Sequence, residues 1–247
     1  MHRLMWRMPQ RLVRRILGAG VLLAASALAA NAQVCDSTVV ARLPLIERPG
    51  TGTGATLVVL MTGDGGWAKA DERVAEGLQA RGGAVIGLNM RAYLGHRRSP
   101  DEVAADVACL AAIYRIRWRR PRLMLLGYSR GADIAPFVAS RLPSDLREAL
   151  NMVALVSPSQ HANFQFHLID LIRDVRRDDD VPLLPEIEKL RGLNVLCIYG
   201  RSDNASLCTQ LDASLARVVA REGGHRIVGG FDAMSDVLSE GLRNPKD

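Results

Sequence analysis

One short motif has a residue pattern suited to nucleophilic catalysis. It reads Gly127-Tyr128-Ser129-Arg130-Gly131, with an apolar run at 123–126 before it and a helical pattern from Ala132 onward. The pattern Gly-x-Ser-x-Gly between a strand and a helix is typical of a nucleophile elbow, a turn so sharp that the serine backbone is strained. The motif therefore predicts that the hydroxyl of Ser129 is held at the end of a strand, facing a helix N-terminus.

A serine hydroxyl is a weak nucleophile, so this prediction requires a general base. In α/β-hydrolases, where the elbow is found, the chain order is serine, then Asp or Glu, then histidine. The five histidines are His2, His96, His161, His167 and His225. Only His225 follows the last predicted strand and precedes the last predicted helix. We therefore expect His225 to be the base, with a purely structural histidine as the alternative.

The acid that orients the base is expected on a loop between the serine and the histidine. Asp203 fits this place, because it follows a strand predicted at 195–199. One alternative is that Asp203 only caps the helix after it. Asp170 and Asp174 are alternative acids, although no predicted strand directly precedes them.

Acyl transfer also needs N–H donors for the oxyanion of its tetrahedral intermediate. The backbone N–H of Arg130, directly after the serine, is one candidate. The second donor normally lies after the third strand, and here the backbone N–H of Asp64, in the glycine-rich stretch 62–67, is the candidate. This stretch lacks the Lys-Ser/Thr ending of a P-loop and the spacing of a dinucleotide-binding turn. We expect no cofactor, and no Cys/His spacing resembles a metal site.

Apolar runs alternate with helical patterns, which favours a mostly parallel central sheet flanked by helices, as in the α/β-hydrolase fold. The strands are predicted at 39–46, 55–61, 84–88, 122–126, 152–156, 195–199 and 217–220. The helices are predicted at 70–80, 100–117, 132–141, 207–215 and 232–242. The helix from Pro100 is the best supported, because Ser99 and Glu102 can form a capping box around it.

Residues 158–192 break this alternation, so we expect them to form an insertion near the mouth of the site. Within it, Phe166 and His167 are candidates for substrate contact, with packing as the alternative. Trp67 and Asp133, which lie in the two glycine-containing motifs, complete the set of substrate-binding candidates.

The first 32 residues have the features of a secretory signal peptide. Five arginines precede an apolar stretch at 16–30, and Ala30-Asn31-Ala32 is a small-x-small cleavage site. The stretch is shorter than the roughly 20 residues of a membrane-spanning helix, although an uncleaved anchor is the alternative. Removing the leader lowers the net charge from +6 to about +1, so the basic pI does not predict nucleic-acid binding. We expect a periplasmic protein with a single domain over 33–247.

The four cysteines all follow this leader and would enter an oxidising compartment. Cys197–Cys208 is the favoured pair, because it would close the short loop that holds Asp203 and stabilise it by roughly 2–3 kcal/mol. Cys35–Cys109 then follows by elimination. Buried free thiols are the alternative.

Six segments together carry a resemblance. They are Thr62-Gly63-Asp64-Gly65-Gly66-Trp67, Arg98-Ser99-Pro100-Asp101, Gly127 to Asp133, Phe164-Gln165-Phe166-His167, Cys197 to Cys208, and Gly223-Gly224-His225. In these segments the chain resembles the bacterial virulence proteins VirJ and AcvB over about residues 52–240. The resemblance implies an α/β-hydrolase-fold protein of the periplasm, with Ser129 as nucleophile, Asp203 as acid and His225 as base. Two positions depart from the family: Arg130 is usually apolar or aromatic, and Arg226-Ile227 is usually a histidine followed by an aromatic residue.

The resemblance implies two different functions. AcvB-like members hydrolyse aminoacylated phosphatidylglycerol, chiefly lysyl-phosphatidylglycerol, and this ester suits Ser-His-Asp chemistry at a phospholipid surface. A lysyl group would need a nearby carboxylate, for which Asp64 and Asp133 are candidates. VirJ-like members are linked to type IV secretion of T-DNA complexes, so an accessory factor with secretion components as partners is the alternative. A general periplasmic esterase or peptidase is a third hypothesis.

Overall fold

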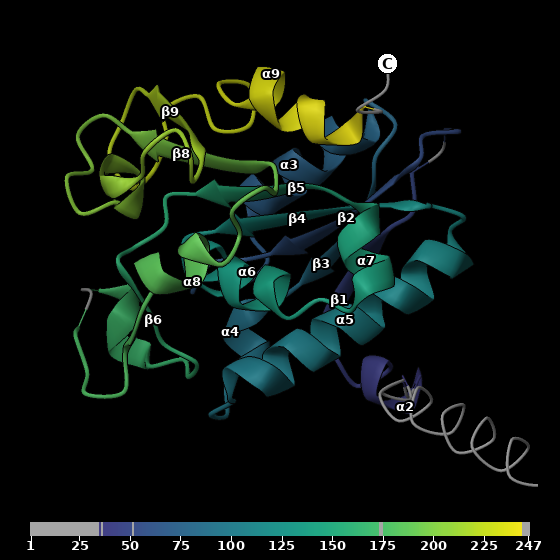
Figure 1. Ribbon diagram of the computed structural model, residues 1–247, viewed down its shortest axis with the longest axis horizontal. Helices are drawn as coiled ribbons and strands as arrows, with labels where there is room; N and C mark the ends of the chain where they lie inside the picture. The colour runs from purple at the N-terminus through teal and green to yellow at the C-terminus, as the bar shows by residue number, and fades with distance from the viewer. Residues whose placement is uncertain (1–34, 36, 51, 173–174, 244–247) are drawn as a thin grey trace, which may run out of the picture. The chain divides into compact units, whose positions relative to one another are not determined.

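A seven-stranded sheet forms the centre of the computed structural model, which describes residue 35 and residues 37–50, 52–172 and 175–243 (Figure 1). Its strands lie in the order β1-β3-β2-β4-β5-β8-β9. Their bounds are β1 Leu45–Arg48, β2 Thr56–Met61, β3 Ala84–Leu88, β4 Arg122–Tyr128, β5 Leu150–Val156, β8 Val195–Gly200 and β9 Arg217–Arg221. Only β1 pairs antiparallel with its neighbour among these described strands, which confirms the mostly parallel sheet.

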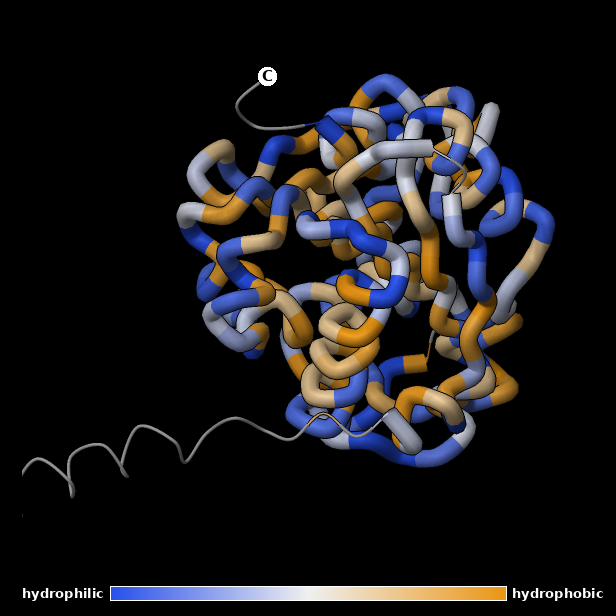
Figure 2. Tube along the Cα trace, turned by 90° about the vertical axis from the view of Figure 1, so that its right-hand side faces the viewer, coloured by the Kyte–Doolittle hydropathy of each residue, from blue (hydrophilic) through white to orange (hydrophobic). Residues whose placement is uncertain are grey.

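The central strands consist mostly of apolar residues because both faces of the sheet are covered. Every residue of β2 and of β3 is buried. Parallel strands with helices on both faces read as continuous apolar runs rather than as alternating ones. Apolar segments, orange in Figure 2, accordingly run through the interior, and hydrophilic segments gather at the periphery.

Two hydrophobic cores lie on opposite faces of the sheet. Val59 of β2 belongs to the core that α5 and α6 cover, whereas Val58 and Leu60 belong to the core that α3 and α9 cover. Successive residues of a strand point to opposite faces, so these helices form the two outer layers seen in Figure 1. The helices are α2 Ser37–Val40, α3 Lys69–Gln79, α4 Met90–Tyr93, α5 Pro100–Arg117, α6 Arg130–Ser140, α7 Ser144–Ala149, α8 Leu184–Glu188 and α9 Ser235–Leu238, with 3-10 helices at Leu168–Leu171, Leu207–Gln210 and Ser239–Leu242.

The start of α5 confirms the predicted capping box. The Ser99 hydroxyl accepts a hydrogen bond from the Glu102 N–H at 3.2 Å, and the Glu102 carboxylate accepts one from the Ser99 N–H at 2.6 Å. Pro100 takes the first turn, where its missing N–H would have no helical partner. The sequence therefore determines this boundary locally.

The strand predicted at 39–46 is wrong in its first half. Residues Ser37–Val40 form the short helix α2, and β1 begins only at Leu45. Pro44 separates the two: it has no N–H to donate, whereas its carbonyl accepts a hydrogen bond from the N–H of Asn89 at 3.0 Å. The strand can join the sheet only after the proline.

The two helices predicted last in the chain are shorter than expected. Of 207–215, only Leu207–Gln210 is helical, as a 3-10 turn, because the Asp212 carboxylate binds the N–H and hydroxyl of Ser214 and so stabilises a local turn instead. Of 232–242, the helical part begins at Ser235 and changes to a 3-10 helix at Ser239.

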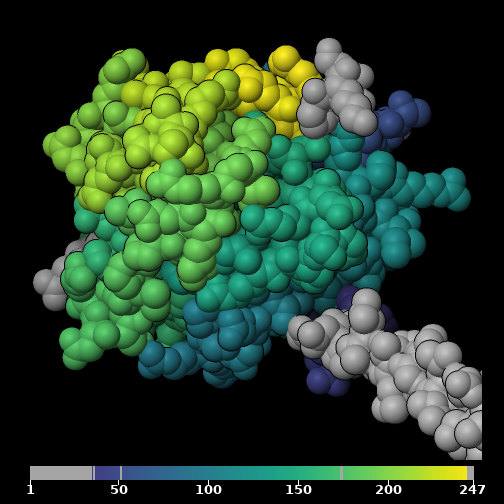
Figure 3. All heavy atoms as spheres, viewed as in Figure 1, coloured from purple at the N-terminus to yellow at the C-terminus, as the bar shows by residue number. Residues whose placement is uncertain are grey.

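The segment 158–192 forms a small substructure of its own. Strand β6, His161–Ala162, pairs antiparallel with β7, Val181–Pro182, and the 3-10 helix Leu168–Leu171 lies between them in the chain. In Figure 3 the green residues of this region lie next to the yellow-green residues that follow them in the chain. The segment thus lies on the same side of the fold as the loops that follow the late strands.

The predicted leader, residues 1–32, lies outside the described residues. Among the helices that are described, none is both long enough and apolar enough to span a bilayer.

Candidate active site

Ser129 occupies a strained turn between β4 and α6. Its backbone has φ 52° and ψ −119°, a left-handed conformation that is costly for a residue with a side chain. The two glycines of the motif allow the turn to close: a Cβ on Gly127 would lie 2.2 Å from the carbonyl oxygen of Gly131, and a Cβ on Gly131 would lie 2.0 Å from that of Met61. The turn has the geometry of a nucleophile elbow.

The structure brings Ser129, His225 and Asp203 together. Nε2 of His225 lies 2.9 Å from Oγ of Ser129, and Nδ1 of the same ring lies 3.4 Å from Oδ2 of Asp203. Ser129 directly follows β4, Asp203 comes three residues after β8, and His225 comes four residues after β9. The carboxyl ends of parallel strands meet at one edge of a sheet, and this is how residues far apart in sequence become neighbours.

The loop of Asp203 is held by a disulfide. Cys197 and Cys208 are bonded, as predicted, and the Asp203 N–H donates to the carbonyl of Gly200 at 2.8 Å. Ser206, not Asp203, caps the 3-10 helix that follows, which leaves the Asp203 carboxylate to face His225. Cys35 and Cys109 are also disulfide-bonded, so the alternative of free thiols is wrong.

The glycine-rich stretch after β2 lies against the elbow. A Cβ on Gly63 would sit 3.2 Å from the Cβ of Ser129. The Gly66 N–H donates to the carbonyl of Gly63 and closes a tight turn around Asp64. Neither the backbone N–H of Asp64 nor that of Arg130 has a hydrogen-bond acceptor within the described residues. Both N–H groups therefore stay candidates for the oxyanion donors.

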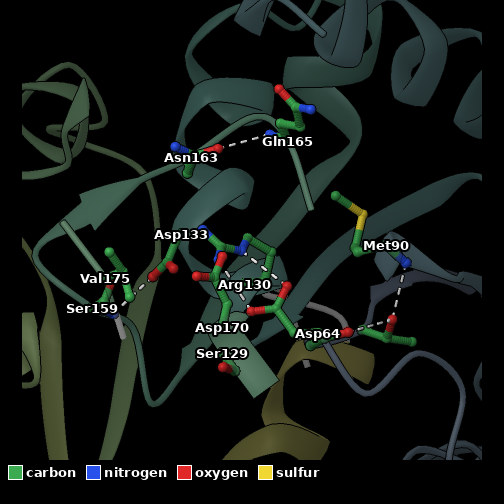
Figure 4. Close-up of polar contacts among 12 residues, drawn as sticks. Asp64, Met90, Ser129, Arg130, Asp133, Ser159, Asn163, Gln165, Asp170 and Val175 are labelled. Atoms are coloured by element: carbon green, nitrogen blue, oxygen red, sulfur yellow. Dashed lines mark hydrogen bonds and ion pairs between the residues drawn. The ribbon is translucent and has the colours of Figure 1, made fainter. Parts of the chain in front are cut away.

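The Arg130 side chain is ion-paired beside the serine (Figure 4). Its Nε and one terminal nitrogen lie 3.1 Å from the two carboxylate oxygens of Asp64, and that nitrogen lies 3.0 Å from Oδ2 of Asp170. Asp170 is also bound by Arg177 at 2.6 Å. Although burial opposes the charged form, the carboxylates of Asp64, Asp133 and Asp170 raise the pKa of the guanidinium.

Sequence comparison places the chain in a family. The profile described as "Bacterial virulence protein (VirJ)" matches residues 55–246, most of the chain. The protein belongs to the VirJ family. No curated protein sequence matches it significantly.

Solved structures of proteins described as esterases or hydrolytic enzymes share the fold of this VirJ-family protein. Est1E from Butyrivibrio proteoclasticus, with ferulic acid bound, has a TM-score of 0.55 and 13% identity, over 79% of this chain and 91% of that one. A probable hydrolytic enzyme from Pseudomonas aeruginosa has a TM-score of 0.56 and 15% identity, over 81% and 89%. The esterase domain of a Rhodothermus marinus protein has a TM-score of 0.53 and 16% identity, over 79% and 88%. Identities this low show the fold alone, and it is the predicted α/β-hydrolase fold.

Asp133 lies inside the fold. It is 4% exposed, and its Oδ1 accepts the Ser159 N–H at 2.7 Å. Burial raises the pKa of its carboxyl to about 7, although the charge of Arg130 and the Ser159 hydrogen bond act in the opposite direction. The Asp133 carboxyl is thus buried and bound to Ser159, and its direct contact with a substrate stays a prediction.

Trp67 makes packing and hydrogen-bond contacts next to the glycine-rich stretch. Its ring packs so closely on Gly87 that a Cβ there would lie 2.2 Å from a ring carbon. Its Nε1–H donates to the Glu72 carboxylate at 2.7 Å. Trp67 is partly buried by these packing contacts, and its contact with a substrate stays a prediction.

Phe166 and His167 lie in the segment 158–192. Phe166 is half-buried against the hydrophobic core, and the guanidinium carbon of Arg91 lies 5.2 Å from the centre of its ring. Nε2 of His167 is buried without a hydrogen-bond partner among the described residues. Phe166 thus makes packing contacts, and one ring nitrogen of His167 has no hydrogen-bond partner among the described residues.

The sequence did not predict the role of Asp170. From the sequence, Asp170 is only an alternative acid for the triad, whereas the structure shows it paired with Arg130 and Arg177. One signal could have pointed to this pairing: an arginine directly after a buried elbow needs carboxylates, because a buried unpaired cation is strongly destabilising.

Proposed function

We propose that this VirJ-family protein is a serine esterase that uses Ser129, His225 and Asp203. The observation that carries the proposal is the distance of 2.9 Å between Nε2 of His225 and Oγ of Ser129 at a strained elbow. A nucleophile within hydrogen-bond reach of a base, which in turn faces an acid, is the arrangement that acyl transfer requires. The fold likeness to esterases and hydrolytic enzymes agrees with this chemistry.

In this mechanism, Oγ of Ser129 attacks the ester carbonyl while Nε2 of His225 accepts its proton. The Asp203 carboxylate stabilises the imidazolium that forms. The N–H groups of Arg130 and Asp64 donate to the oxyanion, where charge develops only in the transition state and intermediate. His225 then gives its proton to the leaving alcohol, and a water molecule hydrolyses the acyl-enzyme by the same steps in reverse order.

We propose that the substrate is an aminoacyl ester of phosphatidylglycerol, chiefly the lysyl ester. Asp64 supports this: its side chain is 18% exposed, it lies in the loop that faces Ser129, and each oxygen accepts one hydrogen bond from Arg130. A carboxylate has further acceptor sites, so Asp64 can also bind the ammonium group of an aminoacyl ester. The Arg130 charge is neutralised by two carboxylates and does not repel such a substrate.

The proposed place of action is the periplasm, at the surface of a phospholipid membrane. The leader-like residues 1–32 and the use of all four cysteines in disulfides support export. A role as an accessory factor of type IV secretion is the second candidate, supported by the virulence description of the family.

A fluorophosphonate probe tests the catalytic proposal. The wild-type protein should be labelled covalently, Ser129→Ala should not be, and Ser214→Ala, which removes a surface hydroxyl, should be labelled as the wild type is. An unlabelled wild type would count against an esterase and favour the accessory role.

Vesicles that contain lysyl-phosphatidylglycerol test the substrate. The wild-type protein should release free lysine, and a deletion strain should accumulate the aminoacylated lipid. A protein that is labelled by the probe but leaves this lipid intact in both experiments would be an esterase of another specificity.

A further inference from the structure

One guanidinium connects two separate chain segments beside the elbow. The Arg130 side chain is only 8% exposed and bonds Asp64, in the loop after β2, and Asp170, in the segment 158–192 (Figure 4). The bond to Asp64 is two-pronged, with both distances at 3.1 Å, and the bond to Asp170 is 3.0 Å. A planar guanidinium that is hydrogen-bonded to two carboxylates has little freedom to rotate.

Asp170 is fixed as firmly as Arg130. Its side chain is 2% exposed, and Arg177 binds it at 2.6 Å and 3.3 Å. In the turn that carries Asp170, the polar side chain of Asp170 is buried, whereas the apolar side chains of Leu168 and Ile172 are 69% and 81% exposed. Ion pairs, rather than apolar burial, therefore hold this turn against the elbow.

Stability alone is a poor explanation for this arrangement. Burying charges has a desolvation cost that the ion pairs offset only partly, and well-packed apolar residues at such places are often as stabilising or more so. The position after the nucleophile carries a buried arginine that requires two partners from distant segments. Because Asp64 and Asp170 bind the residue directly after the nucleophile, their ion pairs point to a role in the site rather than in stability.

We propose that Arg130 and Asp170 are positioning residues that hold the two oxyanion donors at a fixed separation. This rests on the proposed function, in which the backbone N–H groups of Arg130 and Asp64 are the donors. The side chains of these same two residues are bonded to each other, so the pair limits the distance between their backbones. Asp170 keeps the guanidinium in the orientation that reaches Asp64.

Asp170→Asn and Arg130→Met test the inference. Both should lower kcat for p-nitrophenyl acetate by roughly 10- to 100-fold, because oxyanion donors act in the transition state and a small misplacement is costly there. KM should change less than threefold, since the ground-state ester does not depend on these donors. The rate of fluorophosphonate labelling should fall in parallel with kcat. Arg130→Lys keeps the charge but not the fork, so it should not restore kcat.

Glu186→Gln is the matched control. Glu186 is a buried carboxylate that binds Arg141, at the other end of α6, and Lys189. It joins the same helix to the same segment but is remote in sequence from the elbow. Glu186→Gln should lower the melting temperature and leave kcat per folded molecule unchanged. If Asp170→Asn behaves like Glu186→Gln, the network is only structural and the inference is overturned.

A double variant tests the inference even where the Arg130→Met variant fails to fold. Asp64→Asn and Asp170→Asn both act through Arg130, so the double variant should lose no more than about threefold in kcat beyond the worse single variant. Independent, multiplicative losses would overturn the inference while leaving the proposed esterase intact. A wild-type protein inert to the probe would overturn both.

Discussion

Nδ1 of His225 lies 3.4 Å from Oδ2 of Asp203, whereas Nε2 of the same ring lies 2.9 Å from Oγ of Ser129. The first contact has ion-pair distance without hydrogen-bond alignment, and Oδ2 of Asp203 is buried without a hydrogen-bond partner among the described residues. A buried carboxylate oxygen without a donor gains most when the imidazole becomes charged. We expect this contact to shorten when the imidazolium forms, since catalytic hydrogen bonds often tighten only in the reacting complex.

The first prediction is that Asp203→Asn lowers kcat by roughly 10³- to 10⁴-fold, because the amide cannot stabilise the imidazolium and favours the wrong tautomer. Steady-state ester hydrolysis measures this loss. Asp212→Asn is the control: its carboxylate is exposed and binds only Ser214 and backbone groups nearby, so kcat should stay at the wild-type value. Equal activity of Asp203→Asn and wild type would remove Asp203 from the mechanism.

The second prediction concerns the disulfide that closes the Asp203 loop. Replacing Cys197 and Cys208 together by alanine should lower the free energy of unfolding by roughly 2–3 kcal/mol, the loop-closure estimate for a separation of 11 residues. It should also lower kcat, because Asp203 would no longer be held against His225. Chemical denaturation and ester hydrolysis measure the two effects. A double variant with the stability and kcat of the wild type would show that the loop keeps its conformation without the disulfide.

The third prediction is that Gly63→Ala lowers kcat by about tenfold while Gly65→Ala does not. A Cβ on Gly63 would lie 3.2 Å from the Cβ of Ser129, so the loop or the elbow must shift by a few tenths of an ångström. A Cβ on Gly65 meets no atom within 4 Å, and neither glycine has a positive φ. Both variants should therefore fold. Equal kcat values would mean that the loop does not contribute to the site.

The meeting of Ser129, Asp203 and His225 could be predicted because the fold fixes the chain order in which parallel strands deliver their loops. With the elbow at Ser129, the chain order of the fold selects His225 as the base and Asp203, at the end of a predicted strand, as the acid. The sharp turn itself is also readable, because only glycines permit the approach of Gly127 to Gly131.

The contact between Arg130 and Asp170 could not be predicted in the same way. The segment 158–192 has no helical or strand periodicity that would place its residues, and the two side chains are 40 residues apart. The packing of Trp67 on Gly87 is unpredictable for a related reason: Gly87 lies in another strand, and a lone tryptophan beside a motif does not reveal which face it covers. Local patterns predict local structure, whereas these contacts depend on how loops pack.

The fourth prediction is a pH dependence of stability that originates at Asp133. Its pKa is about 7 in the folded state, and an unfolded aspartate has a pKa of about 3.9. Between these values the folded state binds more protons, so the free energy of unfolding falls as pH rises from about 4 to 7 and levels off above 7. The groups facing Asp133 are the Arg130 guanidinium, the Asp64 carboxylate and the Ser159 backbone.

Asp133→Asn isolates this effect, because the amide resembles the protonated carboxyl and can still accept the Ser159 N–H through its oxygen. Relative to wild type, the variant should gain stability as pH rises from 4 to 7, by an amount on the order of a few kcal/mol. Asp212→Asn should show no such change between pH 4 and 7, since hydrogen bonds from Ser214 lower the pKa of Asp212 and its contribution to stability is lost only below about pH 4. Urea denaturation at several pH values measures both differences. A difference between Asp133→Asn and wild type that does not change with pH would mean that Asp133 stays ionised inside the fold, held by Arg130.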